Sequence, residues 1–277
     1  MVVIVFGSGG QLGKAIQSIS TSSSINFHFF DSKQVDITKL VDVESVFLRL
    51  RPDFCVNAAA YTAVDQAEVE QDKAELVNRL GVLNIAQSCV KHNTTLVHIS
   101  TDFVFDGEKN EPYLETDPTN PQGAYGRTKR EGELGIVHSM KKYFIIRTSW
   151  LYSEYGHNFK KTMLRLVREK ESLSVVNDQI GSPTNAIDLA EAILVIANSK
   201  SANFGIYHYS NQGSTSWYGF AKKIFEDNHI STDLKGIPTS EYPTLAKRPK
   251  YSVLDTSKIR KEFGIKIRSW EEALAKK

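Results

Sequence analysis

A glycine-rich turn directly follows the first apolar run of the chain. Residues 2–6 (Val-Val-Ile-Val-Phe) are typical of a strand buried on both faces of a parallel sheet. Gly7, Gly10 and Gly13 then give the spacing G-x-x-G-x-x-G at the start of a helical pattern. Such a turn lets the backbone approach a pyrophosphate, and the helix directs unpaired N–H groups at the phosphates. A tight turn without a ligand is the alternative, but its place after an opening strand favours dinucleotide binding.

An acidic residue ends the second predicted strand. Asp31 lies 18 positions after Gly13, where a carboxylate accepts hydrogen bonds from the adenosine ribose of a dinucleotide. This placement favours NADH. Lys33 is positioned to meet the 2′-phosphate of NADPH instead, so both cofactors stay open. The alternative for Asp31 is a simple turn-forming role.

Short apolar runs alternate with helical patterns in the first half of the chain. This alternation is typical of βαβ units with right-handed crossovers, and it predicts an α/β fold with a Rossmann-like, doubly wound parallel sheet. We expect residues 1–150 to form an NAD(P)-binding Rossmann domain and residues 151–277 to form mainly a smaller C-terminal substrate-binding lobe, with a return of the chain to the main sheet near 173–210. The predicted strands are 2–6, 26–30, 54–57, 96–99, 143–146, 173–176 and 206–209, and the predicted helices are about 11–20, 42–50, 66–91, 123–140, 158–170, 185–198, 215–228 and 257–263.

Composition argues against several classes of protein. Among 277 residues, 34 Lys and Arg balance 32 Asp and Glu, which leaves a formal charge of +2 and no general attraction for nucleic acid or an anionic membrane. Cys55 and Cys89 are too few for a disulfide framework and lack metal-ligand spacing. No apolar run approaches the ~20 residues that span a bilayer, and the first residues do not resemble a signal peptide. We therefore expect a cytoplasmic protein.

Tyr125 and Lys129 lie one helical turn apart in a predicted helix. A phenol normally has a pKa of about 10, and a cation one turn away lowers that value, so the pair suits proton transfer near neutral pH. Thr101 follows a predicted strand, and ligands of open α/β sheets bind at such strand ends. Thr101 is therefore placed to hydrogen-bond the carbonyl that Tyr125 would protonate. The alternative for the Tyr–Lys spacing is an ordinary amphipathic surface pair.

Several motifs occur together along nearly the whole chain. With the glycine turn, they make the chain similar to the dTDP-4-dehydrorhamnose reductase family, within the extended short-chain dehydrogenase/reductase superfamily. Each motif alone is weak, but their order and separations are specific. They are residues 57–65 (Asn-Ala-Ala-Ala-Tyr-Thr-Ala-Val-Asp), 100–107 (Ser-Thr-Asp-Phe-Val-Phe-Asp-Gly), 125–129 (Tyr-Gly-Arg-Thr-Lys), 147–150, 156–159, 178–184 and 248–249.

The resemblance implies a role for each matching residue. Tyr125 would be the proton donor, Lys129 its partner and a ligand of the nicotinamide ribose, and Thr101 the residue that tunes the tyrosine. Substrate contacts would come from Thr101, Asp102 and Trp150, with Asn158 and Phe159 at the nucleotide end and Arg248 at the diphosphate. The cofactor would be bound by Gly7, Gly10, Gln11, Leu12, Asp31, Asp36, Ile37, Ala60, Tyr61, Thr62, Tyr125 and Lys129.

The implied activity is reduction of the 4-keto group of a nucleotide-linked 4-keto-6-deoxy sugar by NADPH or NADH, with dTDP-4-dehydro-L-rhamnose and dTDP-L-rhamnose as the favoured substrate and product. The product would enter polysaccharide biosynthesis. The nucleotide, dTDP or UDP, stays open, as does a monomer or a homodimer. Neither nucleic acid nor a membrane is an expected partner. No metal is implied, because Ala15 stands where some relatives carry a glutamate that binds magnesium at a dimer interface.

Two other functions compete with this one. Bifunctional epimerase/reductases act on UDP- or other nucleotide-linked 4-keto sugars, but they need a cysteine beside the active-site Ser/Thr, where this chain has Asp102 and Phe103. A non-catalytic regulatory subunit, like that of methionine adenosyltransferase, is built on the same fold. The presence of Thr101, Tyr125 and Lys129 favours an enzyme, although folds and pockets outlive their chemistry.

Overall fold

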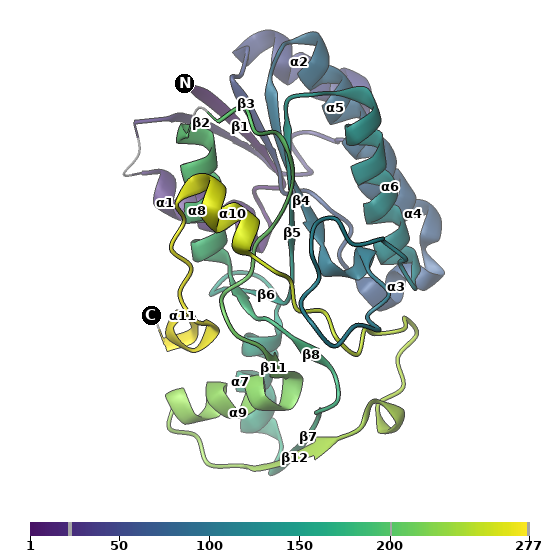
Figure 1. Cartoon of the computed structure of the whole chain (residues 1–277), viewed down its shortest axis with the longest axis vertical. Coiled ribbons are helices and arrows are strands. Elements are labelled where there is room, and N and C mark those ends of the chain that lie inside the picture. The colour runs from purple at the N-terminus through teal and green to yellow at the C-terminus, as the bar shows by residue number, and fades with distance from the viewer. Residues whose placement is uncertain (22–23, 200, 276–277) are drawn as a thin grey trace.

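The computed structural model describes residues 1–21, 24–199 and 201–275, and its centre is a parallel six-stranded sheet (Figure 1). Each strand pairs in parallel with its neighbours. The predicted α/β class with a doubly wound parallel sheet is confirmed. In spatial order the strands are β10 (Gly205–His208), β5 (Tyr143–Thr148), β4 (Thr95–Thr101), β3 (Phe54–Asn57), β1 (Val2–Phe6) and β2 (Asn26–Phe30).

Helices cover both faces of this sheet. Val3 and Val5 of β1 point into one core, and Ile4 and Phe6 point into the other. Burial on both faces explains why β1 is apolar at every position instead of alternating. The first core contains side chains of α1 (Gln11–Ser20), α8 (Ala186–Asn198) and α10 (Ser257–Phe263), and the second those of α2 (Leu40–Leu50), α5 (Val82–Lys91) and α6 (Ala124–Ser139).

The strand order reverses between β1 and β3. From β1 the chain passes to β2 on one side, and β3 then lies on the other side of β1. In open α/β sheets such a reversal leaves a crevice outside the carboxyl ends of the strands, where ligands bind. The glycine turn after β1 and the segment after β3 both lie at this edge.

A second lobe lies below the carboxyl ends of the strands (Figure 1). Its core is formed by α7 (Phe159–Glu169), α9 (Trp217–Asp227), α11 (Trp270–Ala275) and the parallel pair β7 (Ser172–Val176) and β12 (Asp233–Ile237). Between these elements the chain returns to the main sheet, where α8 packs on α1 and β10 forms the edge strand. Short strands connect the two parts: β6 (Leu151–Tyr152), β8 (Ile180–Gly181), β9 (Thr184–Asn185) and β11 (Thr215–Ser216).

One helix prediction is wrong. Residues 66–91 do not form a single helix, because α3 (Val64–Val69) ends before α4 (Gln71–Glu75), and a π-helix (Leu76–Gly81) separates α4 from α5. A π-helix shifts hydrogen bonding to i→i+5, and apolar periodicity does not reveal such a shift. The strand β12 and the helix α11 were also not predicted. No helix in the described part of the chain is long and apolar enough to cross a membrane.

Candidate active site

The glycine turn packs tightly against two neighbouring segments. Gly7 has a φ of +82°, and a Cβ there would lie 2.4 Å from the backbone N of Ala59. A Cβ on Gly13 would lie 2.4 Å from the carbonyl oxygen of Gly7. Gly10 has more space around it, because the atom nearest to a Cβ at this position would be Gly7 O, at 3.4 Å. Gly7 and Gly13 are thus required by packing, whereas Gly10, the N-cap of α1, keeps open the space in front of the helix.

The carboxylates after β2 form local turns. Asp31 Oδ1 accepts hydrogen bonds from the backbone N–H groups of Lys33 (2.9 Å) and Gln34 (3.1 Å). Asp36 Oδ1 accepts from the N–H and the hydroxyl of Thr38, which together with Lys39 keep the pKa of this carboxyl below its usual value. The side chain of Ile37 is buried, and its carbonyl accepts from Asn84 Nδ2. Of the three predicted residues in this segment, Asp31 and Asp36 therefore present carboxylate oxygen atoms, and Ile37 does not.

The segment after β3 is held by a residue that sequence reasoning missed. Asn78, in the π-helix, accepts a hydrogen bond from the N–H of Tyr61 (2.9 Å) and donates to the carbonyl of Tyr61 (3.1 Å) and to the hydroxyl of Thr128 (3.2 Å). The π-helix thus ties α6 to residues 60–62, the predicted cofactor-lining segment. The hydroxyl of Tyr61 donates to Glu70 (2.8 Å), so its side chain is also held in place.

Tyr125 lies at the carboxyl end of β4. The helix α6 lies close to the 3₁₀ turn at Asp102–Val104. A Cβ on Gly126 would lie only 2.1 Å from Phe103 O, so the glycine is what allows this close approach. This approach brings the half-buried Tyr125 near Thr101, whose hydroxyl acts on its pKa, and against the ring of Phe103, edge-on at 5.6 Å. Burial raises the pKa of Tyr125 to about 12, while the Thr101 hydroxyl opposes that rise. The predicted lowering of this pKa by Lys129 is therefore wrong, because the burial of the phenol outweighs it.

Asp102 is buried beside Thr101. The Thr101 hydroxyl donates to Asp102 Oδ1 at 3.0 Å, and the Asp102 side chain is 3% exposed. Burial raises the pKa of this carboxyl to about 6, although the nearby hydroxyls of Ser252 and Thr101 work against the rise. Thr101, Asp102 and Tyr125 therefore form one contiguous group, as the sequence motifs predict for the reacting end of a site.

Lys129 is buried on the face of α6 that covers the sheet. Its Nζ donates to the carbonyl of Ile99 at 2.6 Å and lies 3.5 Å from His98 Nε2. Burial lowers the pKa of Lys129 to about 8, and the carboxylate of Glu133 partly offsets this. The ammonium and the Tyr125 phenol thus both sit over the last residues of β4.

Trp150 has one ring face covered by a residue that the sequence did not single out. Its indole stacks on Trp217 with the ring centroids 3.5 Å apart and the planes at 5°. A Cβ on Gly181 would lie 2.4 Å from Trp150 Cε2, so the ring also abuts the backbone of β8. Trp150 has a φ of +47°, which is uncommon for a bulky residue and is often found at functional sites. The half-buried ring leaves only part of its surface for a ligand.

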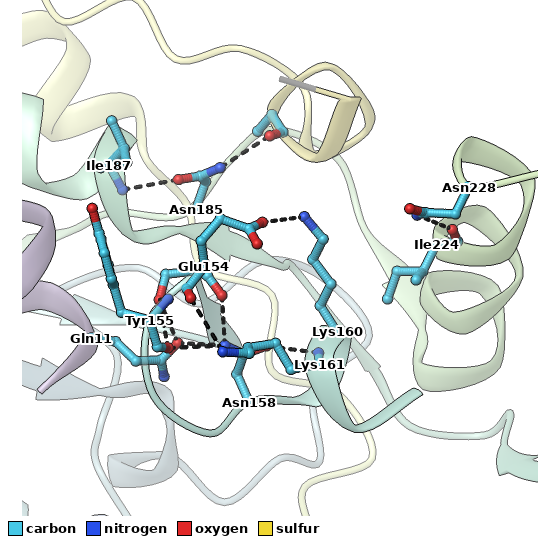
Figure 2. A network of polar contacts seen from close by, with 12 residues as sticks. Gln11, Glu154, Tyr155, Asn158, Lys160, Lys161, Asn185, Ile187, Ile224 and Asn228 are labelled. Carbon is cyan, nitrogen blue, oxygen red and sulfur yellow. Dashed lines mark hydrogen bonds and ion pairs between the residues drawn. The ribbon is translucent and has the colours of Figure 1, made fainter. Parts of the chain in front are cut away.

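Gln11 and Asn158 join the glycine turn to the second lobe (Figure 2). Gln11 Oε1 accepts hydrogen bonds from Asn158 Nδ2 and from the hydroxyl of Ser153, each at 2.9 Å. Asn158 Nδ2 also donates to the carbonyl of Ser153 (2.7 Å), and Asn158 Oδ1 caps the start of α7 by accepting from Lys161 N. Asn158, which is predicted to lie at the nucleotide end of the substrate, is therefore hydrogen-bonded to Gln11, which is predicted to contact the pyrophosphate of the cofactor.

A late segment of the chain covers the other side of the site. Arg248 forms an ion pair with Asp65, a residue of α3. The Oδ1 atom of Asp65 also accepts a hydrogen bond from Ala246 N at 3.1 Å. The Arg248 guanidinium lies 5.9 Å from the centroid of the Phe103 ring, and this ring also contacts the ring of Tyr125. A small pocket here is lined by Phe103, Phe105, Asp106, Gln122, Gly123, Lys247, Arg248 and Pro249. Phe159 instead packs in the second-lobe core.

The family model described as "RmlD substrate binding domain" matches residues 1–277. The chain belongs to this family. A dTDP-4-dehydrorhamnose reductase from Aggregatibacter actinomycetemcomitans is 41% identical, over 98% of this chain and 96% of the relative. The spore coat polysaccharide biosynthesis protein SpsK of Bacillus subtilis is 43% identical, over 98% and 95%.

Solved structures of this family share the fold. The dTDP-4-dehydrorhamnose reductase of Bacillus anthracis, in complex with NADP, superposes with a TM-score of 0.94 at 42% identity, over 99% of this chain and 96% of that one. The RmlD family relationship inferred from the motifs is therefore confirmed. The roles of individual site residues stay predictions.

Proposed function

We propose that this chain is an NADPH-dependent reductase of dTDP-4-dehydrorhamnose. The observation that carries the proposal is the convergence of Tyr125, Thr101 and Lys129 at the carboxyl end of β4. Relatives of the same family that are about 40% identical bear the name of this reductase, and the B. anthracis relative binds NADP. NADH remains a second candidate cofactor, because Asp31 stands where a carboxylate meets an adenosine ribose.

The glycine turn fits the pyrophosphate of a dinucleotide. Gly10 caps α1 without a side chain, and no side-chain hydrogen bond satisfies the first N–H groups of the helix. These groups, at Gln11 and Leu12, would hold the phosphates, while Asp31 and the segment Ala60–Thr62 would flank the rest of the cofactor. When bound, the reduced nicotinamide supplies the hydride for the keto carbon.

Tyr125 would hold and then release the proton. Its pKa of about 12 keeps the phenol protonated at neutral pH, as a proton donor requires. Once the proton has passed to the keto oxygen, the hydroxyl of Thr101 and the nearby ammonium of Lys129 stabilise the phenolate. Lys129 has a pKa of about 8, so it is charged at pH 7. Asp102 and the open part of Trp150 would bind the sugar nucleotide.

The test follows NADPH absorbance with dTDP-4-dehydro-L-rhamnose made in situ by the upstream dehydratase and epimerase. A parallel assay leaves out the epimerase. Oxidation of NADPH only with the epimerase present supports a dedicated 4-keto reductase. Turnover without it would indicate the bifunctional epimerase/reductase, and product stereochemistry would distinguish that from reduction of the unepimerised sugar. Bound cofactor without any turnover would favour the non-catalytic subunit.

The same assay with the UDP-linked sugar compares the two nucleotides. One methyl group on the base changes binding by only about 1–3 kcal/mol, so we expect a preference for dTDP and not exclusive use of it. A cytoplasmic location and a monomeric or homodimeric state remain predictions. Sedimentation of the purified chain measures the second of these.

A further inference from the structure

Two buried polar residues lie under Lys129, and the proposed chemistry does not use them. Asn57 ends β3 and His98 lies beside it on β4, as paired residues in the sheet register. Their side chains are 1% and 0% exposed. Asn57 Nδ2 and His98 Nδ1 are 3.1 Å apart, and on the other side of the ring His98 Nε2 lies 3.5 Å from Lys129 Nζ. The three side chains thus form a row from β3 to α6.

The Asn57 amide fixes which ring nitrogen of His98 carries the proton. Asn57 Oδ1 accepts a hydrogen bond from the N–H of Ala59 at 3.1 Å, so its Nδ2 must face the ring. An amide nitrogen only donates, and His98 Nδ1 must therefore accept. Burial, together with the charge of Lys129, keeps the pKa of His98 well below its usual value, so the ring is neutral. In this neutral tautomer the proton is on Nε2.

The imidazole consequently presents an N–H to the amine of Lys129. A charged ammonium also only donates, so the two groups cannot hydrogen-bond, and the charged amine turns instead to the carbonyl of Ile99. The charged group acting on Lys129 is Glu133 on α6, whose carboxylate is engaged by Arg147 and Arg130. His98 is therefore a neighbour on β4 to which the ammonium cannot hydrogen-bond.

We propose that Asn57 and His98 are positioning residues for Lys129, which keep its amine off the His98 ring and directed toward the carbonyl of Ile99 and the site. The proposal deepens the function proposed above and rests on it only for its catalytic consequence. An accepting nitrogen at the same place would hold the ammonium against His98. Lys129 would then stay charged to higher pH and lie farther from the reacting groups.

Two variants of Asn57 remove the hydrogen bond that fixes the tautomer of His98. Asn57→Asp keeps the shape and the acceptor for Ala59 N, but it draws the proton to Nδ1 and leaves Nε2 as an acceptor. Asn57→Leu removes the amide donor without adding charge. Both variants should lower kcat at pH 7. Both should also shift the alkaline limb of the pH profile of kcat to higher pH, by about one pH unit for Asn57→Asp and by less for Asn57→Leu. A fall in kcat at every pH with an unmoved limb would overturn the proposal.

The matched control is Cys55→Ala, which alters an equally buried residue two positions earlier, on the same face of β3. We expect it to leave the limb in place. A limb that moves as far in this control would also overturn the proposal, because the shift would then report sheet packing.

Nitrogen-15 NMR of the histidines in the wild-type protein tests the tautomer without turnover, with His98 assigned by its absence from His98→Gln. We expect a neutral ring protonated at Nε2. Protonation at Nδ1, or a charged ring at pH 7, would refute the positioning pair even if the chain is an active reductase. The expected tautomer in a protein without reductase activity would instead contradict the proposed function alone.

Discussion

Tyr125 and Lys129 lie one turn apart on α6, and burial favours the neutral form of each. It raises the pKa of the phenol to about 12 and lowers that of the amine to about 8. A proton donor must be neutral before it reacts, and its partner must be charged when the phenolate forms. Near pH 7 both conditions hold. At the residue scale, these protonation states support the proposed transfer of a proton from Tyr125 to a bound carbonyl.

Tyr125→Phe removes the proposed proton donor while keeping the ring on Phe103. We expect kcat to fall by about 10²–10⁴-fold, because general acid catalysis contributes that much. Binding of NADPH and the melting temperature should change little. Steady-state kinetics, together with fluorescence titration of NADPH, measures the effect. A variant that keeps nearly full turnover would exclude Tyr125 as the proton donor.

Asp102→Asn should stabilise the protein above pH 6. The folded-state pKa of Asp102 is raised to about 6 by burial, so its contribution to stability is complete below the unfolded value near 4 and is lost as the pH rises through 6. Asparagine avoids this loss. Thermal melts should show a gain of about 2 kcal/mol at pH 7.5, roughly 4–8 °C, and little gain at pH 4. Equal gains at both pH values would contradict the assignment.

At the element scale, the start of α1 has two different tasks. Gly7 and Gly13 let the turn pack on the segment after β3 and on itself, while Gly10 leaves open the front of the helix. The same spacing of glycines therefore serves both the folding of the turn and the proposed binding of the cofactor. The contacts of Gln11 extend this turn to the loop before α7.

Gly10→Ala and Gly13→Ala separate these two tasks. A Cβ on Gly10 meets only Gly7 O, at 3.4 Å, so stability should fall by less than about 1 kcal/mol, whereas the methyl group should weaken NADPH binding at least tenfold. A Cβ on Gly13 clashes with backbone, and that variant should lose several kcal/mol. Melting curves and cofactor titrations compare them. Equal losses of stability would argue against the distinction.

Asn158→Asp tests the link between α1 and α7. The carboxylate keeps the cap on Lys161 N, but it loses the donors to Gln11 Oε1 and Ser153 O. We expect a loss of about 1–3 kcal/mol. A double-mutant cycle with Gln11→Ala should give a coupling energy above about 0.5 kcal/mol, measured by urea unfolding. Additive losses would show that the two side chains stabilise the protein independently.

At the scale of the whole molecule, the second half of the chain contributes to both parts. The strand β10 and the helices α8 and α10 complete the main sheet, and α9 and α11 build the second lobe. Each passage between the two parts crosses the site edge. Opening one part therefore removes contacts from the other, and we expect a single unfolding transition.

Ile259→Ala tests this coupling. Ile259 is fully buried in the main core, and its truncation should cost about 2–5 kcal/mol. The three tryptophans, Trp150, Trp217 and Trp270, all lie in or against the second-lobe core. The midpoint of urea unfolding measured by their fluorescence should fall by the same amount as the midpoint measured by the circular dichroism of the whole chain. A fluorescence midpoint that stays at the wild-type value would show that the lobes unfold separately.

Local sequence patterns were enough to predict the features that depend on near neighbours in the chain. Apolar runs predicted the strands of the parallel sheet, glycine spacing predicted the turn at α1, and the four-residue interval predicted that Tyr125 and Lys129 share a face. The motif order also predicted the family. These are local signals, since strand and helix periodicities relate residues only a few positions apart.

Contacts between side chains far apart in the chain became known from the three-dimensional fold alone. Asn57 and His98 are 41 residues apart and touch because β3 and β4 pair in that register. Gln11 and Asn158 are 147 residues apart, and Trp150 meets Trp217 only once the second lobe has formed. Such contacts follow from strand register and packing between elements, which no short window of sequence encodes.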